Sequence, residues 1–372
     1  MYEYFLKPIF FLIDPENEHN FFVWFGEKLG ATALGRGLVG LFCTYRHPAL
    51  RTSVAGIEFE NPIGLGAGFD KDVHLTKIMP SVGFGFMEVG AVTHYPYEGN
   101  KGLRVARLVA DNSLIVYYGL KNIGAEAIIK KMPRLRDAAG QFAIPVGVNI
   151  AKTNRADIKG LASVEDYAAS YRMLSPHFSY VTINVSCPNA QDGTLFQDPA
   201  MLDGLLAALA REEKKVPVFL KISNHLSMAE VDDILAVVGK YPFVDGFVIG
   251  NLSKRRNEIV FKSSPEQLNV IPQGGISGAP IREMSTNLIR HVYSRTNAAG
   301  GKYIIIGLGG VFTAEDAYEK ILAGASLVQM VTGLIYGGPT VVKRINKGLV
   351  KLLARDGYAH IAEAIGAEGK KK

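Results

Sequence analysis

Cysteine is scarce in this 372-residue sequence, and its scarcity limits the kind of protein encoded. The two cysteines, Cys43 and Cys187, are too few for a disulfide framework, so we expect a reducing compartment. Long apolar runs are also missing, because none reaches the ~18–20 residues needed to cross a bilayer. The first arginine is Arg36 and acidic residues precede it, so neither a signal peptide nor a transit peptide is expected.

Runs of one charge are short as well. The net charge is +6, yet the basic residues are scattered, and the densest internal run is Lys254-Arg255-Arg256. This pattern argues against a nucleic-acid partner and is compatible with an anionic ligand or an anionic membrane surface. The sequence has no Walker lysine motif and no dinucleotide-binding glycine fingerprint, and no metal site is predicted.

Residues 1–50 are too rich in aromatic and leucine side chains for a free surface segment. Two short helices fit, at about 17–30 and 32–43, with Gly30 and Gly35 near their joint. One interpretation packs both helices on the domain that follows. The other makes them an apolar surface that dips into a membrane interface or lines a tunnel. The sequence pattern is compatible with both interpretations.

From residue 51 onward, short apolar runs typical of buried strands alternate with amphipathic stretches. The apolar runs cover residues 63–67, 86–92, 144–150, 180–185, 218–222, 246–250, 303–307 and 327–331. The helical patterns cover residues 164–174, 201–212, 228–238, 281–293 and 314–323. Eight strand–helix units predict an α/β fold, a (β/α)₈ TIM barrel over residues 51–372, with residues 1–50 as a small helical extension. A doubly wound open sheet is the alternative fold. Residues 52–59 fit a hairpin that caps the floor of the predicted barrel.

Glycines mark the ends of the last two predicted strands. The seventh ends in Gly307-Leu308-Gly309-Gly310, and the eighth in Val331-Thr332-Gly333 ahead of a predicted helix. Glycine lets backbone N–H groups approach a ligand, a helix N-terminus favours an anion, and these two loops are the usual phosphate site of such barrels. The alternative is that the glycines only make tight turns. We expect a phosphate-bearing cofactor such as FMN.

Further polar residues lie at or beside predicted strand ends. Lys221 falls within the fifth strand, where an unpaired charge is costly, and Lys71 follows the first, where it could also be a surface charge. The fourth strand ends in a cysteine between two amides, Asn184, Cys187 and Asn189. A thiol there could act as a base or a nucleophile, or be an inert buried side chain, and amides suit a ring with carbonyl and N–H groups.

From residue 14 to about 338, the sequence resembles dihydroorotate dehydrogenases. The motifs that carry the resemblance are Asp14-Pro15-Glu16 with His19, NPIGLGAGFDK at 61–71, EVGAVT at 88–93, GVNI at 147–150, NVSCPN at 184–189, GGISG at 274–278 and GASLVQ at 324–329. The helical N-terminal extension is similar to that of the quinone-linked branch. The resemblance implies an FMN enzyme that oxidises dihydroorotate or a related small ring, reduces a quinone and contacts a membrane peripherally, from its cytoplasmic side, through the N-terminal helices.

The resemblance also implies roles for individual residues. The positions matching cofactor-binding residues are Ala67, Gly68, Lys71, Thr93, Asn149, Asn184, Lys221, Gly278, Gly310, Thr332 and Gly333. The positions matching substrate-binding residues are Lys71, Asn184, Asn189 and Asn251. Cys187 occupies the position of the catalytic base.

Three positions depart from the family pattern. Cys187 stands where the quinone-linked branch usually has serine, Val116 stands at the place of a substrate-binding asparagine, and Leu252 stands in the usual Thr-Asn-Thr of the sixth strand. A site without expected amides leaves polar groups of the substrate unpaired or binds another molecule. Two alternatives therefore stay open: an FMN enzyme for a different cyclic amide or carboxylate, and a catalytically silent barrel that binds a flavin or a pyrimidine.

Overall fold

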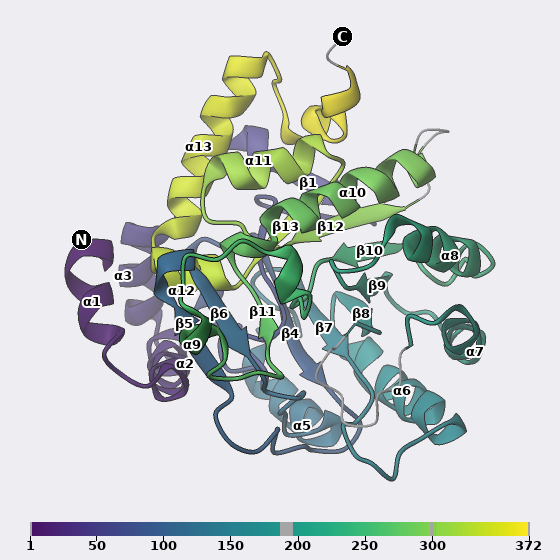
Figure 1. The fold of residues 1–372 in the computed structure, drawn as a ribbon. Coiled ribbons are helices and arrows are strands. Elements are labelled where there is room, and N and C mark those ends of the chain that lie inside the picture. Colours follow the sequence, from purple (N-terminus) through teal and green to yellow (C-terminus); the bar gives the residue numbers. More distant parts are fainter. Residues whose placement is uncertain (1, 187–195, 298–300, 302, 371–372) are drawn as a thin grey trace.

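A computed structural model describes residues 2–186, 196–297, 301 and 303–370. Its centre is a closed barrel of eight parallel strands in the order β10-β12-β13-β3-β4-β7-β8-β9 (Figure 1). The strands are β3 (Ile63–Leu65), β4 (Phe86–Val92), β7 (Val146–Ile150), β8 (Tyr180–Asn184), β9 (Val218–Ile222), β10 (Gly246–Ile249), β12 (Ile304–Leu308) and β13 (Leu327–Met330). The predicted barrel is confirmed, and the open doubly wound alternative is wrong because β13 pairs with β3 and closes the sheet.

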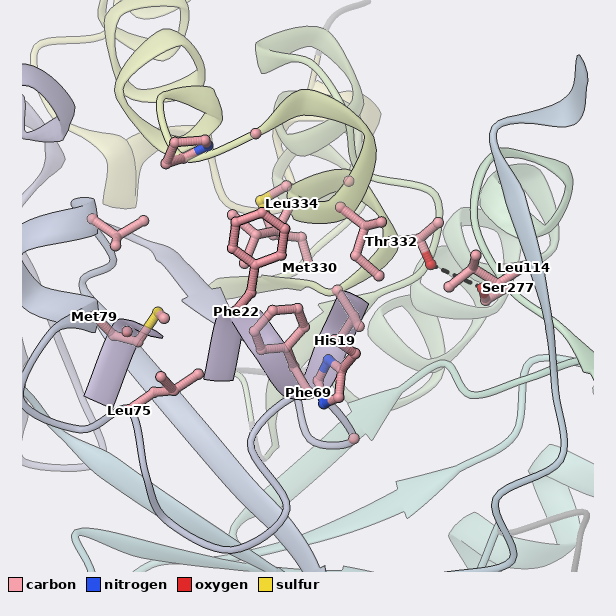
Figure 2. Close-up of a pocket in the computed structure, with 18 of the residues that line it drawn as sticks. His19, Phe22, Phe69, Leu75, Met79, Leu114, Ser277, Met330, Thr332 and Leu334 are labelled. Atoms are coloured by element: carbon pink, nitrogen blue, oxygen red, sulfur yellow. Dashed lines mark hydrogen bonds between the residues drawn. The ribbon is translucent and has the colours of Figure 1, made fainter. Parts of the chain in front are cut away.

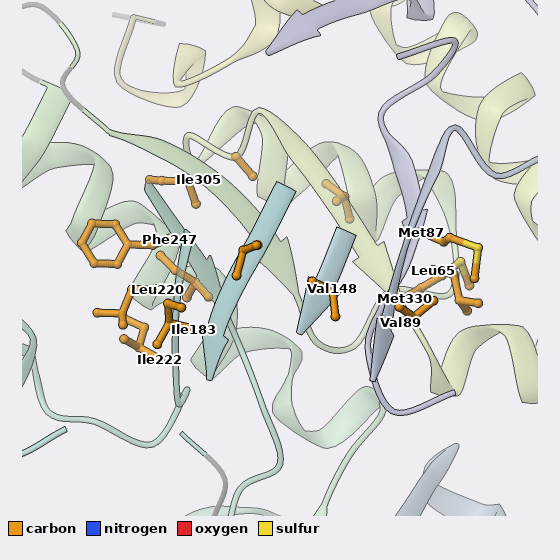
Figure 3. Packing of buried hydrophobic residues seen from close by; sticks show 14 of the residues in the cluster. Leu65, Met87, Val89, Val148, Ile183, Leu220, Ile222, Phe247, Ile305 and Met330 are labelled. Atoms are coloured by element: carbon orange, nitrogen blue, oxygen red, sulfur yellow. The ribbon is translucent and has the colours of Figure 1, made fainter. Parts of the chain in front are cut away.

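The five predicted helices are present on the outside of the barrel. They are α6 (Leu161–Leu174), α7 (Pro199–Leu209), α8 (Met228–Val238), α10 (Arg282–Asn297) and α11 (Ala314–Leu322). Their starts follow local chemistry, since α8 begins with a reciprocal capping box between Ser227 and Glu230, and α11 begins with one between Thr313 and Asp316. The core lies between strands and helices, and Figure 3 shows apolar side chains of the strands packed there.

A hairpin closes the N-terminal end of the barrel, as predicted. Its strands are β1 (Thr52–Val54) and β2 (Ile57–Phe59), which pair antiparallel. Phe59 packs edge-on against Phe86, with ring centroids 5.3 Å apart, and joins Tyr180 and Phe219 in an apolar cluster inside the barrel. This cluster fills the floor, so the open mouth of the barrel is at the opposite end.

A small antiparallel sheet next to the mouth was not predicted. It contains β5 (Val105–Leu108), β6 (Ser113–Val116) and β11 (Gly275–Ile276), in the order β11-β6-β5. Gly275 pairs with Val116, far apart in the sequence, so short-range periodicity could not reveal this sheet. The helices α4 (Met79–Val82), α5 (Ala125–Leu135), α9 (Pro265–Leu268) and α13 (Val341–Asp356) also went unpredicted, whereas α12 (Thr332–Gly337) is the helix expected after the eighth strand.

The N-terminal segment forms α1 (Lys7–Phe10), α2 (Pro15–Ala31) and α3 (Ala33–Cys43), so the two predicted helices are confirmed. Thr32 ends α2 and caps α3, because its hydroxyl accepts from Gly35 N at 3.0 Å. Figure 1 shows these helices beside β5, β6, α12 and α13. Among the described residues, no helix is both long and apolar enough to cross a membrane.

Candidate active site

One cavity of about 660 Å³ joins the barrel mouth to the N-terminal helices (Figure 2). Its barrel end is lined by the predicted site residues Ala67, Gly68, Lys71, Lys221, Asn251, Gly278, Gly310, Thr332 and Gly333. Its other end is lined by apolar side chains of α2, α3 and α4, namely Phe22, Phe25, Leu29, Leu38, Val39, Phe42, Met79 and Val82. Residues that sequence motifs placed at separate strand ends therefore face one continuous space.

A buried chain of side-chain amides lies beside this cavity. Asn149 on β7 donates to Glu88 Oε1 at 2.8 Å, and Asn184 on β8 donates to Asn149 Oδ1 at 2.9 Å. Asn184 Oδ1 accepts from the backbone N–H and hydroxyl of Ser186, at 3.1 and 3.0 Å. Asn251 Nδ2 then donates to the Ser186 hydroxyl at 2.8 Å. The sequence indicated the three asparagines, and the structure connects them.

Glu88 and Ser186 are members of this network that the sequence reasoning did not single out. Glu88 is fully buried on β4, and its second oxygen accepts from Thr182 Oγ1 at 3.0 Å and Gln329 Nε2 at 2.9 Å. The sequence signal that could have identified Glu88 is an acidic residue within an apolar strand, because a buried carboxyl group needs hydrogen-bond partners. Asn149 and Asn184 are not among the residues that line the cavity, and through Ser186 they are connected to Asn251, which does line it. Their direct contact with a cofactor or substrate stays a prediction.

Two lysines place positive charge at the barrel end of the cavity. Lys221 on β9 is only 3% exposed. Lys71 lies with Nζ 4.1 Å from the ring centroid of Tyr118, in a cation–π arrangement. Burial lowers the pKa of Lys71 to about 8, with nearby Asp72 acting in the opposite direction. The surface-charge alternative for Lys71 is wrong, and both ammonium groups can face an anionic or electron-rich ring.

The predicted phosphate site is a glycine-lined cradle. Gly278 and Gly310 have φ of +85° and +70°, and a Cβ on Gly333 would lie 2.0 Å from Val311 O. Thr332 Oγ1 lies 2.8 Å from Ser277 Oγ, the contact dashed in Figure 2. Within the described parts of the chain, no acceptor receives the backbone N–H of Gly310, Thr332 or Gly333. Unpaired N–H donors on a narrow glycine wall fit a phosphate group.

The remaining predicted residues divide into three groups. Thr93 is buried away from the cavity, where its hydroxyl donates to Tyr95 O at 2.6 Å and accepts from Asn122 Nδ2 at 2.8 Å. Val116 and Leu252, the departures from the family pattern, do line the cavity. Cys187 and Asn189 lie outside the described residues, so the structure gives no account of them.

The cavity end near the N-terminal helices carries its own polar groups, which the sequence reasoning left without a role. His19 on α2 contacts Phe69 edge-on, with centroids 5.0 Å apart, and burial lowers its pKa to about 3, with a smaller effect from Lys71. The imidazole is therefore neutral at physiological pH. Glu18 and Arg107 form a buried ion pair on the same wall.

The outer surface of the N-terminal helices is also apolar. Leu12, Leu34, Leu41 and Phe42 are 87%, 74%, 71% and 65% exposed. Large apolar side chains are rarely so exposed in one region of a soluble surface. The helices therefore pack on the barrel through one face, as the first interpretation expects, and leave the other face uncovered. Contact of this uncovered face with a membrane stays a prediction.

Comparisons with known proteins agree on one family. The family model described as dihydroorotate dehydrogenase matches residues 49–353. A dihydroorotate dehydrogenase (quinone) of Natronomonas pharaonis is 36% identical over 363 residues, covering 98% of both chains. One from a Nostoc species is 40% identical and covers 86% of this chain and 84% of its own. These names do not favour the alternative of a different cyclic substrate.

Solved structures give the same answer for the fold. The ligand-free crystal structure of the dihydroorotate dehydrogenase from Eimeria tenella superimposes with a TM-score of 0.83 at 28% identity, covering 96% of this chain and all of that one. The same enzyme in complex with ferulenol gives a TM-score of 0.80 and covers 96% of each chain. The likeness extends over the N-terminal helices as well as the barrel.

Proposed function

The chain belongs to the dihydroorotate dehydrogenase family, and we propose that it oxidises dihydroorotate to orotate in pyrimidine synthesis and passes the electrons to a quinone. The observation that carries this proposal is the single cavity, which has amides, lysines and a phosphate cradle at one end and an apolar wall at the other. The first end suits a polar ring and its cofactor. The second suits a hydrophobic electron acceptor.

We propose FMN as the cofactor. The unpaired N–H groups of Gly310, Thr332 and Gly333 would hold its phosphate, and Lys71 and Lys221 would face its ring. When bound, FMN supplies the redox chemistry, because it takes two electrons from the substrate and returns them to an acceptor. Narrow glycine positions, where a Cβ would collide with the chain, fit a phosphate that approaches the backbone closely.

The side chains of this protein would perform the remaining tasks. Asn251, fixed by Ser186, and Asn189 would orient the substrate ring through its carbonyl and N–H groups. Cys187, as the thiolate, would take the proton from the substrate carbon that neighbours a carbonyl group. The Lys221 ammonium would stabilise negative charge that develops on the bound ring system.

The uncovered apolar surface of α1, α2 and α3 supports a peripheral membrane contact. A quinone dissolved in the bilayer would enter the cavity between α2 and α3, whose side chains line its apolar end. We propose that this contact is with the cytoplasmic side of the membrane. The basic net charge of +6 is compatible with an anionic lipid surface.

Anaerobic rapid mixing with dihydroorotate tests the proposed reaction. The purified protein should be yellow, release one FMN per chain on denaturation and lose its flavin absorbance when dihydroorotate is added without oxygen. A short-chain quinone should then restore the absorbance. Release of FAD or of no flavin contradicts the cofactor assignment, and a yellow protein that no dihydropyrimidine bleaches points to the silent barrel instead.

A further inference from the structure

The most unusual group in the apolar end of the cavity is a buried ion pair. Glu18 on α2 and Arg107 on β5 both line the cavity, and their side chains are only 7% and 8% exposed. Arg107 Nη2 donates to Glu18 Oε2, while Nη1 donates to the backbone oxygens of Ile13 at 2.8 Å and Phe11 at 3.3 Å. The chain itself therefore occupies most of the guanidinium.

This pair determines the net charge at the apolar end. Charged side chains that line the whole cavity, within the part of the molecule described, are Glu18, Arg107, Lys71 and Lys221, and both lysines lie at the barrel end. His19, which also lines the cavity, is neutral because burial lowers its pKa to about 3. With Glu18 and Arg107 opposed, the apolar end carries no net charge, although it contains a cation that could bind a carboxylate.

We propose that Glu18 makes the apolar end of this cavity selective for uncharged ligands, because it neutralises Arg107 and prevents amphiphiles with a carboxylate from pairing with it. The inference rests on the proposed function, in which the ligand of this end is a neutral quinone. A carboxylate that enters must lose its hydration with no free cation to replace it, whereas a quinone carries no such cost.

The same helix forms a second ion pair that does not line the cavity, and this pair already anchors the helix to the barrel side. Glu16 on α2 accepts from Arg104, at 2.9 Å from Nε and 2.5 Å from Nη2, and neither residue lines the cavity. This second pair joins the helix to the chain next to β5 without facing a ligand. The two pairs share their residue types and lie two residues apart on one helix, so Glu16→Gln is a matched control for Glu18→Gln.

The experiment measures binding of laurate and dodecan-1-ol to the full-length FMN-loaded protein by isothermal titration calorimetry at pH 7.5. The parent protein should bind dodecanol and bind laurate at least about tenfold more weakly. Glu18→Gln leaves Arg107 uncompensated and should strengthen laurate binding about tenfold or more, with little change for dodecanol. Glu16→Gln should behave like the parent. Laurate should also become a competitive inhibitor of quinone reduction in Glu18→Gln alone.

Arg107→Gln provides the mirror test if Glu18→Gln does not fold. It leaves a lone carboxylate at the same place, so binding of dodecylammonium should strengthen while laurate binding stays weak. The inference is overturned if the parent binds laurate as tightly as dodecanol, or if Glu16→Gln gains laurate binding equally. If charge selectivity follows this pattern but neither the parent nor any variant reduces a quinone, the proposed function fails and the selectivity of the apolar end stands.

Discussion

Asn149 donates its side-chain amide to Glu88, with 2.8 Å between Nδ2 and Oε1, and this contact fixes which way the amide faces. Because Asn149 Nδ2 faces the carboxyl group, its Oδ1 faces Asn184 and accepts from that amide at 2.9 Å. Asn184 Oδ1 is then left for Ser186, which holds Asn251. A carboxyl group at the centre of the barrel thus sets the donor and acceptor pattern presented to a ligand.

Glu88→Gln should disrupt this pattern. The Glu88 carboxyl group accepts three hydrogen bonds, and an amide in its place turns one oxygen into a donor that faces another donor. We expect the free energy of unfolding to fall by about 1–3 kcal/mol. The amount of flavin bound per chain should decrease as well. Thermal melting measures the loss of stability, and flavin absorbance measures the bound cofactor. Glu58→Gln, on the exposed face of the hairpin, should change neither the stability nor the bound flavin. Equal losses in both variants would contradict the role of Glu88 in the amide network.

Gly333→Ala should damage the phosphate cradle. A Cβ there would lie 2.0 Å from Val311 O, so the start of α12 must shift and carry the N–H groups of Thr332 and residue 333 with it. We expect the affinity for FMN to fall about tenfold or more, the equivalent of one good hydrogen bond to a charged group. Gly204→Ala, a helical position with open space around its Cβ, is the control and should keep one flavin per chain.

The charge of Lys71 should make anion binding depend on pH. Burial lowers the pKa of this lysine to about 8, so its positive charge is present below that pH and is lost as the pH rises through it. Orotate binding, followed by titration of the flavin spectrum, should therefore weaken between pH 7 and pH 9. Lys71→Met should bind orotate weakly at both values, and a parent-like pH dependence in this variant would assign the effect to another group.

Removing about the first 45 residues should separate the two half-reactions. The deletion takes away α1, α2 and α3, which supply the apolar wall, and leaves the amide network and the phosphate cradle intact. Flavin reduction by dihydroorotate should continue, while quinone reduction and association with vesicles should weaken. Unchanged quinone kinetics in the truncated protein would reject entry of the quinone through these helices.

Cys187 is predicted to be the base, and its variants test that role. Replacement by alanine should lower the rate of flavin reduction by roughly 10²-fold or more, while FMN stays bound. Replacement by serine should retain more activity with the optimum at higher pH, because a hydroxyl is a weaker acid than a thiol of ordinary pKa near ~8.5. Stopped-flow measurements compare the three proteins, and a Cys187→Ala rate equal to that of the parent would remove the residue from the mechanism.

The sequence by itself determined the barrel. Buried parallel strands are short and apolar throughout, and the helices between them repeat every 3.6 residues, so both periods are visible locally in segments such as Phe86–Val92 and Met228–Val238. Gly310 and Gly333 of the phosphate cradle could also be predicted locally, since each follows the end of a barrel strand, whereas Gly278 was indicated only by the family motif.

Only the tertiary structure decided which distant residues meet. The pairing of Gly275 with Val116 and the contacts of Glu88 with Asn149 and Gln329 join segments far apart in the chain, and no local pattern encodes a partner at such separation. The neutralisation of Arg107 by Glu18 is of the same kind. In the sequence both are ordinary charged residues, and they become a buried pair facing one cavity because α2 folds back onto β5.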